Sequence, residues 1–114
     1  MANHIFIDKK ILPYNKTIQV SSDKSISIRV VLLASQAVGI SKISNLLESE
    51  DVLNALKIIK KLGINYKKKK DFYEINGFGL NGFSPKNNAV INAGNSGTLG
   101  RLILSLLIKN EKKI

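Results

Sequence analysis

Two short segments of the chain combine residue types that bind anions. The first is DKSISIR, Asp23–Arg29, in which Lys24 and Ser25 are followed by Arg29 on the same face of a predicted helix. A helix start offers free backbone N–H groups, and a guanidinium matches phosphate or carboxylate. The spacing fits an anion site. It fits equally well a helix capped by Ser25, with a solvated lysine and an arginine paired to an acid.

The second segment is NAGNSGTLGR, Asn92–Arg101. Its glycines Gly94 and Gly97 let the backbone approach a ligand closely or adopt a positive φ. Asn95 can cap a helix or donate to a ligand, and Arg101 lies one turn into that helix. A single turn of this kind is usually a plain helix start. Because the only two arginines of the chain each follow one of these two turns, we favour a shared anionic ligand.

A third pattern resembles a nucleotide-binding motif, but we interpret it as a loop. Gly77, Gly79 and Gly82 satisfy G-x-G-x-x-G, but a dinucleotide fingerprint must open a helix directly after a strand. The residues that follow, 83–85 (FSP), predict a loop instead. The lysine run at 67–70 is interpreted as the solvated tip of a hairpin, since it lacks interleaved aromatic residues.

Composition narrows the possible chemistry of the 114 residues. There is no cysteine, and His4 is the only histidine, which argues against thiol catalysis, thiolate metal sites and a histidine-based triad or zinc site. The net charge is +10, but sixteen of the eighteen basic residues are lysines, typical of a solvated surface. We expect a cytoplasmic protein, because no signal peptide or membrane-length apolar run is visible.

Apolar periodicity and turn residues predict an α/β (α+β) fold. The predicted strands are 3–7, 17–21, 40–44, 64–68, 71–76 and 88–92, and the predicted helices are 25–38, 49–62 and 96–109. This order makes one βαβαββ unit over 17–86 and opens a second over 87–114, after an N-terminal strand segment, 1–16. The last helix has an apolar face without a partner, which suggests a longer protein.

The segments DKSISIR, NLLESEDVLNALKIIKKLG and NAGNSGTLGR, in this order, resemble the 5-enolpyruvylshikimate-3-phosphate synthase (3-phosphoshikimate 1-carboxyvinyltransferase) family. The resemblance covers Val20 to Leu107. Family members are several times longer, so it implies an N-terminal part of a two-domain inside-out barrel, with 1–16 packed against the other domain.

The resemblance also implies an activity in the shikimate pathway. The enolpyruvyl group of phosphoenolpyruvate would pass to the 5-hydroxyl of shikimate 3-phosphate, with release of phosphate and without metal or organic cofactor. Implied ligands of shikimate 3-phosphate are Lys24, Ser25 and Arg29. Implied ligands of phosphoenolpyruvate are Lys24, Asn95 and Gly97, with Arg101 in support. No catalytic residue is implied within this chain, which should not catalyse alone, and the complete enzyme would be a monomer without nucleic-acid or membrane partners.

The sequence departs from the family pattern at two places, and two rival functions remain. Ser21 and Ser22 stand where the family has proline and glycine, and Ile28 replaces a histidine or asparagine and is expected to face the core. One rival is the related UDP-N-acetylglucosamine enolpyruvyl transferase, whose sequence around its early lysine differs from DKSISIR. The other is a small basic nucleic-acid-binding module, which would require one continuous lysine face.

Overall fold

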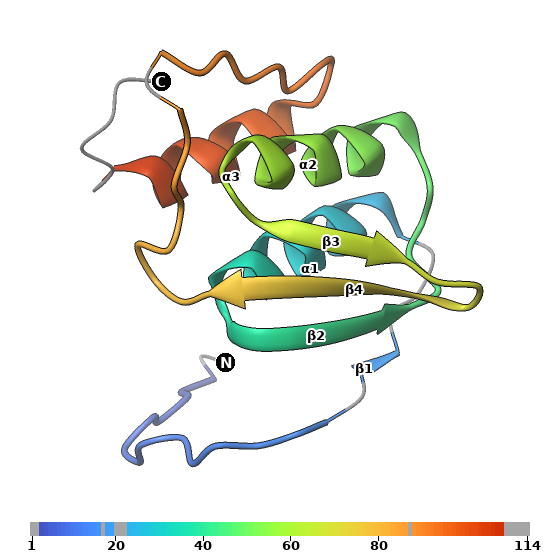
Figure 1. Cartoon of the computed structure of the whole chain (residues 1–114). Coiled ribbons are helices and arrows are strands. Elements are labelled where there is room, and N and C mark those ends of the chain that lie inside the picture. The colour runs from blue at the N-terminus through green and yellow to red at the C-terminus, as the bar shows by residue number, and fades with distance from the viewer. Residues whose placement is uncertain (1–2, 17, 20–22, 87, 109–114) are drawn as a thin grey trace.

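The structure is a computed structural model that describes residues 3–16, 18–19, 23–86 and 88–108. Within these residues a sheet is covered by helices on one side (Figure 1). The elements are β1 (Ile18–Gln19), α1 (Lys24–Gln36), β2 (Val38–Ser44), α2 (Glu50–Lys61), β3 (Asn65–Lys68), β4 (Phe72–Phe78) and α3 (Gly97–Leu107). The first six follow the predicted order βαβαββ.

The four strands lie in the order β1-β2-β4-β3. β1 is parallel to β2, so the chain must cross over between them, and α1 is that crossover. β4 runs antiparallel between β2 and β3, and its register with β2 extends from Val38–Phe78 to Ser44–Phe72. The hairpin β3–β4 carries the lysine run 67–70 at its tip, where these side chains are exposed, as predicted.

The helix α1 buries one side in the core, while Ile26 and Leu33 on its other side stay exposed. Asp23 caps its start by accepting a hydrogen bond from the N–H of Ile26 at 2.8 Å. Ile28 and Val31 are fully buried, which confirms that Ile28 faces the core. The helix ends where Ala37 becomes extended and leads directly into β2.

The helix α2 is amphipathic, and its charges complement the helix dipole. Glu50 and Asp51 lie in its first turn and Lys60 and Lys61 in its last. The apolar stripe faces the sheet and α1, and its members are Val52, Ala55, Leu56, Ile59 and Leu62, all buried. Gly63 follows with φ +91°, so the predicted stop is confirmed.

The two faces of the sheet have opposite character. Ile43, Tyr73 and Ile75 point toward the helices and are buried in the core. On the opposite face Val38 and Ile40 are largely exposed. This alternation confirms the prediction of a half-buried strand over 40–44.

Two predicted strands are wrong. A strand forms only where a neighbour completes its backbone hydrogen bonds, and residues 3–7 have no ladder partner among the described residues. This segment lies away from the helices (Figure 1), with the side chains of Ile5 and Phe6 almost fully exposed. In 88–92 the backbone serves other contacts, since the carbonyl of Val90 accepts from the Lys61 ammonium at 2.9 Å. Asn88 also has a positive φ of 59°.

Other predictions concern segments described only in part. Of the predicted strand 17–21 the structure describes Ile18–Gln19, and Ser21 and Ser22 lie outside the described residues. The glycines of the G-x-G-x-x-G pattern occupy the end of β4 and the turn after it, with no helix directly following, so the loop interpretation is confirmed. No helix among the described residues is long and apolar enough to span a membrane.

Candidate functional site

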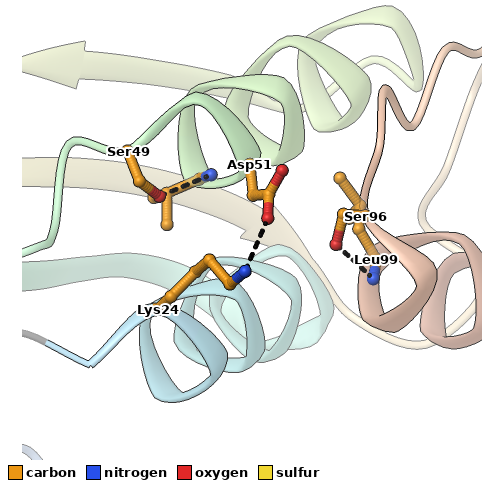
Figure 2. A network of polar contacts seen from close by, with 6 residues as sticks. Lys24, Ser49, Asp51, Ser96 and Leu99 are labelled. Carbon is orange, nitrogen blue, oxygen red and sulfur yellow. Dashed lines mark hydrogen bonds and ion pairs between the residues drawn. The ribbon is translucent and has the colours of Figure 1, made fainter.

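Three helices begin next to one another, and both predicted anion-binding segments belong to these starts (Figure 2). α1 packs against α2 and against α3. Each start has a side-chain cap: Asp23 for α1, Ser49 for α2 and Ser96 for α3. Since each helix start carries partial positive charge, this end of the molecule favours anions.

Lys24, the first residue of α1, reaches across to α2. Its ammonium nitrogen lies 3.1 Å from Oδ2 of Asp51, in the first turn of α2 (Figure 2). The Asp51 side chain is 16% exposed and that of Lys24 54%. The ion pair therefore joins a largely covered carboxylate to an ammonium that solvent, or a ligand, still reaches.

The turn that leads into α3 lies against the same helix, α2. A Cβ placed on Gly94 would come within 2.5 Å of Nδ2 of Asn54. Asn54 follows Asp51 by three residues, and side chains at this spacing share one helix face. One face of α2 thus contacts Lys24 of the first segment and the glycine turn of the second.

Local hydrogen bonds shape the glycine turn. Oδ1 of Asn92 accepts from the N–H of Gly94 at 2.8 Å, while Gly94 has φ +60°. Ser96 is buried, and its hydroxyl accepts from the N–H of Leu99 at 3.1 Å. Asn95 and Gly97 stay exposed on either side of this cap, so both are accessible to a ligand.

The guanidinium of Arg29 folds back along α1. Its Nη1 donates to the carbonyl oxygen of Ser25 at 3.1 Å. In the described part of the chain no carboxylate lies within ion-pair distance of Arg29. Since α1 is capped by Asp23, neither Ser25 as the cap nor an acid-paired Arg29 describes this helix start. Arg101, in the second turn of α3, is also exposed.

The loop 45–49, which precedes α2, is held from both sides. On the α1 side, the N–H of Leu47 donates to the hydroxyl of the buried Ser27 at 3.3 Å. On the sheet side, Oε1 of Glu48 accepts from the Tyr73 hydroxyl at 2.6 Å and pairs with the Lys68 ammonium at 2.7 Å. This loop sets where α2 begins, and therefore where Asp51 lies.

These contacts shift the pKa values of the side chains that make them. Hydrogen bonds from Lys68 and then Tyr73 lower the pKa of Glu48 below its ordinary value. Burial, followed by the hydrogen bond to Glu48, raises the pKa of Tyr73 well above 10.0. At neutral pH the phenol is therefore the donor and the carboxylate the acceptor.

The described residues include no group of three acidic or histidine side chains that could hold a metal ion. Their lysines are spread over different surfaces: Lys57 and Lys60 are exposed on α2, whereas Lys42 and Lys67 flank Glu74 on the outer face of the sheet. Lys57 and Lys60 therefore do not share one continuous face with Lys42 and Lys67.

A family model described as EPSP synthase (3-phosphoshikimate 1-carboxyvinyltransferase) matches residues 9–114. The chain belongs to the EPSP synthase family. A 3-phosphoshikimate 1-carboxyvinyltransferase of Streptococcus mutans serotype c is 45% identical over 92 residues, covering 80% of this chain and 21% of that protein. One of Bradyrhizobium sp. is 43% identical over 93 residues, again 21% of that protein.

Solved structures agree with the sequence comparisons. An EPSP synthase from Acinetobacter baumannii aligns with a TM-score of 0.68 and 31% identity, over 85% of this chain and 23% of that one. The resemblance and the α/β fold class are thereby confirmed. The chain spans about a fifth of the length of the EPSP synthases it matches.

Two residues at this site were not identified as functional from the sequence. Asp51 shares the first turn of α2 with Glu50, where the helix dipole alone explains an acid, and no pattern around Asn54 indicates a function. The contact of Asp51 with Lys24 is not local, so the spacing of residues carries no signal for it. The remaining signal is its position in the segment NLLESEDVLNALKIIKKLG, which the EPSP synthase resemblance includes.

Proposed function

We propose that the protein represented by this chain transfers the enolpyruvyl group of phosphoenolpyruvate to the 5-hydroxyl of shikimate 3-phosphate and releases phosphate. Membership of the EPSP synthase family supports this activity. The observation that carries it is the meeting of both anion-binding segments on one face of α2, through Lys24 and Gly94.

The shikimate 3-phosphate side is assigned to Lys24, Ser25 and Arg29 at the start of α1. A phosphate dianion is bound best by charged donors of fixed geometry. Arg29 is exposed and engaged only with a carbonyl of its own helix, so a phosphate replaces a weak partner. Ser25, half-buried in the first turn, adds a hydroxyl donor.

The phosphoenolpyruvate side is assigned to Asn95 and Gly97 at the start of α3, with Lys24 bridging to it. Space beside Gly97 is open, because no atom lies within 4 Å of a Cβ placed there. An anionic group can therefore approach the backbone N–H groups of the helix start closely. Arg101, one turn further along, adds positive charge in support.

The reaction brings two polyanions together, and cations held in place offset their repulsion and align them. The 5-hydroxyl oxygen bonds to the enol carbon and loses its proton while the methylene carbon gains one, and loss of phosphate together with a proton from that methyl carbon then restores the double bond. The acid–base groups for these steps are not among the residues assigned here, so we expect the 114-residue chain to bind substrates without turning them over. No cofactor is needed.

The proposal includes the setting of the reaction. We place the complete enzyme in the cytoplasm as a monomer, with 17–86 as one βαβαββ unit and 87–114 as the opening of the next. Residues 1–16, of which 3–16 are described and exposed, would pack with a second domain. The exposed Ile5 and Phe6 supply the apolar surface for such packing.

A chimera tests the activity. The segment of the Streptococcus mutans relative that matches this chain is replaced by the chain's own residues, and phosphate release is followed with both substrates. We expect release that requires both substrates and falls at least ~10-fold in Arg29→Ala, since charged hydrogen bonds are lost. Lys57→Ala, on the exposed side of α2, is the control. A folded chimera that releases no phosphate would contradict the proposal.

Binding to the 114-residue chain tests the assigned half-site directly. Shikimate 3-phosphate and unphosphorylated shikimate are titrated separately into the isotope-labelled chain, and NMR shifts are followed. We expect the phosphate ester to bind more tightly by ~10-fold or more, with Arg29→Ala removing most of the difference. Equal affinity for the two ligands would exclude the phosphate contact.

A further inference from the structure

The only ion pair that joins two helix starts in the described structure is Lys24–Asp51. Its two members are unequally accessible, since Asp51 is 16% exposed and Lys24 54%. The carboxylate therefore lies behind the ammonium as seen from solvent. An anion arriving at Lys24 meets an ammonium that already has a negative partner.

The first turn of α2 contains a second acid that serves as a comparison. Glu50 precedes Asp51 and is exposed, and no ion pair joins it to a described residue. Both acids interact favourably with the dipole of α2. Only Asp51 contacts a residue of the proposed substrate site, so its role goes beyond stabilising the helix.

A lysine ammonium has three N–H donors, and the contact with Asp51 occupies part of this capacity. A ligand phosphate can share the ammonium with Asp51, but only by placing two negative groups near each other. The nearby carboxylate therefore weakens the attraction of Lys24 for a lone phosphate. It also holds the flexible lysine side chain between α1 and α2.

We propose that Asp51 is the counter-ion of Lys24, which weakens the binding of phosphate at the ammonium and holds the flexible lysine side chain between α1 and α2. The proposal rests on the proposed function, in which Lys24 contacts anionic substrates. A substrate that also engages Arg29 or the α3 start compensates for the competition, whereas inorganic phosphate, with fewer contacts, does not.

The experiment uses inorganic phosphate as the probe on the 114-residue chain, with affinity measured by NMR titration. Asp51→Asn keeps the size of the side chain and removes its charge. We expect phosphate to bind ~5-fold more tightly or better, between the ~3-fold that Coulomb's law gives in water for a unit charge about 6 Å away and the ~100-fold at the lower effective dielectric of a protein surface. Glu50→Gln makes the same change in net charge in the same helical turn, and we expect less than ~2-fold.

The same substitution in a Lys24→Met variant shows whether the gain in phosphate affinity depends on Lys24. In Lys24→Met the addition of Asp51→Asn should change phosphate affinity by less than ~2-fold, because the competition needs the ammonium. If the gain in phosphate affinity persists without Lys24, or if Glu50→Gln matches Asp51→Asn, the gain comes from the change in net charge alone and the proposal is wrong. Weaker phosphate binding in Asp51→Asn would also overturn it.

A measurement on the unmutated chain covers the case in which Asp51→Asn does not fold. The Lys24 Nζ and Asp51 carboxyl resonances are followed during the phosphate titration. We expect both to shift with one midpoint, since phosphate binding alters the pair. A shift at Lys24 with an unchanged Asp51 carboxyl would contradict competition.

The same titrations separate this inference from the proposed function. If Asp51→Asn tightens phosphate binding but shikimate 3-phosphate binds no better than phosphate, the inference holds and the proposed substrate is wrong. If shikimate 3-phosphate binds through Arg29 and Asp51→Asn changes no phosphate affinity, the substrate assignment holds and the role of Asp51 is wrong.

Discussion

The hydroxyl of Ser27 on α1 accepts a hydrogen bond from the backbone N–H of Leu47 at 3.3 Å. Ser27 is fully buried, and Leu47 lies in the loop 45–49 that leads into α2. This hydrogen bond attaches the helix that carries Lys24 to the loop that sets the position of Asp51. The geometry of the candidate site therefore depends on a residue that no substrate touches.

Replacing this serine tests the attachment. Ser27→Ala leaves the N–H of Leu47 without its partner, and we expect a loss of ~1–2 kcal/mol in the free energy of unfolding, measured by urea denaturation. Ser35→Ala is a matched control, since Ser35 is equally buried on α1 but donates to Leu32 of its own helix. A loss in Ser35→Ala equal to that in Ser27→Ala would argue against a special role for the loop contact.

The contacts of Glu48 predict a dependence of stability on pH. They hold the pKa of Glu48 below 4.5, so the ionised group stabilises the fold above its unfolded-state pKa, and this stabilisation is lost as pH falls through the lower folded-state pKa. Wild type should exceed Glu48→Gln in unfolding free energy at neutral pH, with a difference that shrinks as the pH falls. Denaturation from about pH 7 to about pH 3 measures this. Parallel curves for the two proteins would refute it.

Two glycines that look alike in the sequence should respond oppositely to alanine. An added Cβ on Gly97 meets no atom within 4 Å, so we expect Gly97→Ala to keep or raise stability by up to ~1 kcal/mol, while weakening phosphoenolpyruvate binding. At Gly77 the Cβ would collide with the carbonyl oxygens of Ala34 and Ala37. Gly77→Ala should cost at least ~2 kcal/mol. Thermal unfolding compares the two, and a stable Gly77→Ala would show that the α1–β4 packing is looser than described.

The contribution of α3 to stability should come from only part of its apolar surface. Leu99 is fully buried, and Leu99→Ala should lower the free energy of unfolding by ~2–5 kcal/mol through the cavity it leaves. Leu104 is 67% exposed, so Leu104→Ala should change the free energy of unfolding by less than ~0.5 kcal/mol. Chemical denaturation of both variants checks this. A large loss in Leu104→Ala would mean that the exposed face is covered, for instance by a second copy of the chain.

Predictions that depended on local signals were accurate. The helix α2 was placed to within a residue or two, because its cap, its apolar stripe and Gly63 all lie within one continuous segment. The hairpin was found for the same reason. The strand predictions at 3–7 and 88–92 were wrong because alternating apolar residues form a strand only beside a partner, and these segments have none among the described residues.

The residues of the candidate site also fall into two groups, those that local sequence signals identify and those that only packing identifies. Lys24, Arg29 and Gly97 could be singled out because cations, glycines and helix caps follow one another along the chain. Their roles in binding remain predictions. Asp51 could not be distinguished from Glu50, since both are acids at one helix start, and only packing shows which of them faces α1.

The sequence alone determined which residues are suited to anions and where the helices that carry them begin, because caps, periodicity and side-chain chemistry are local properties. Only the tertiary structure decided that Lys24 is paired to Asp51 and that the turn at Gly94 lies against Asn54. Those contacts join helices separated along the chain by strands and loops. Their formation depends on how α1, α2 and α3 pack, which no single segment encodes.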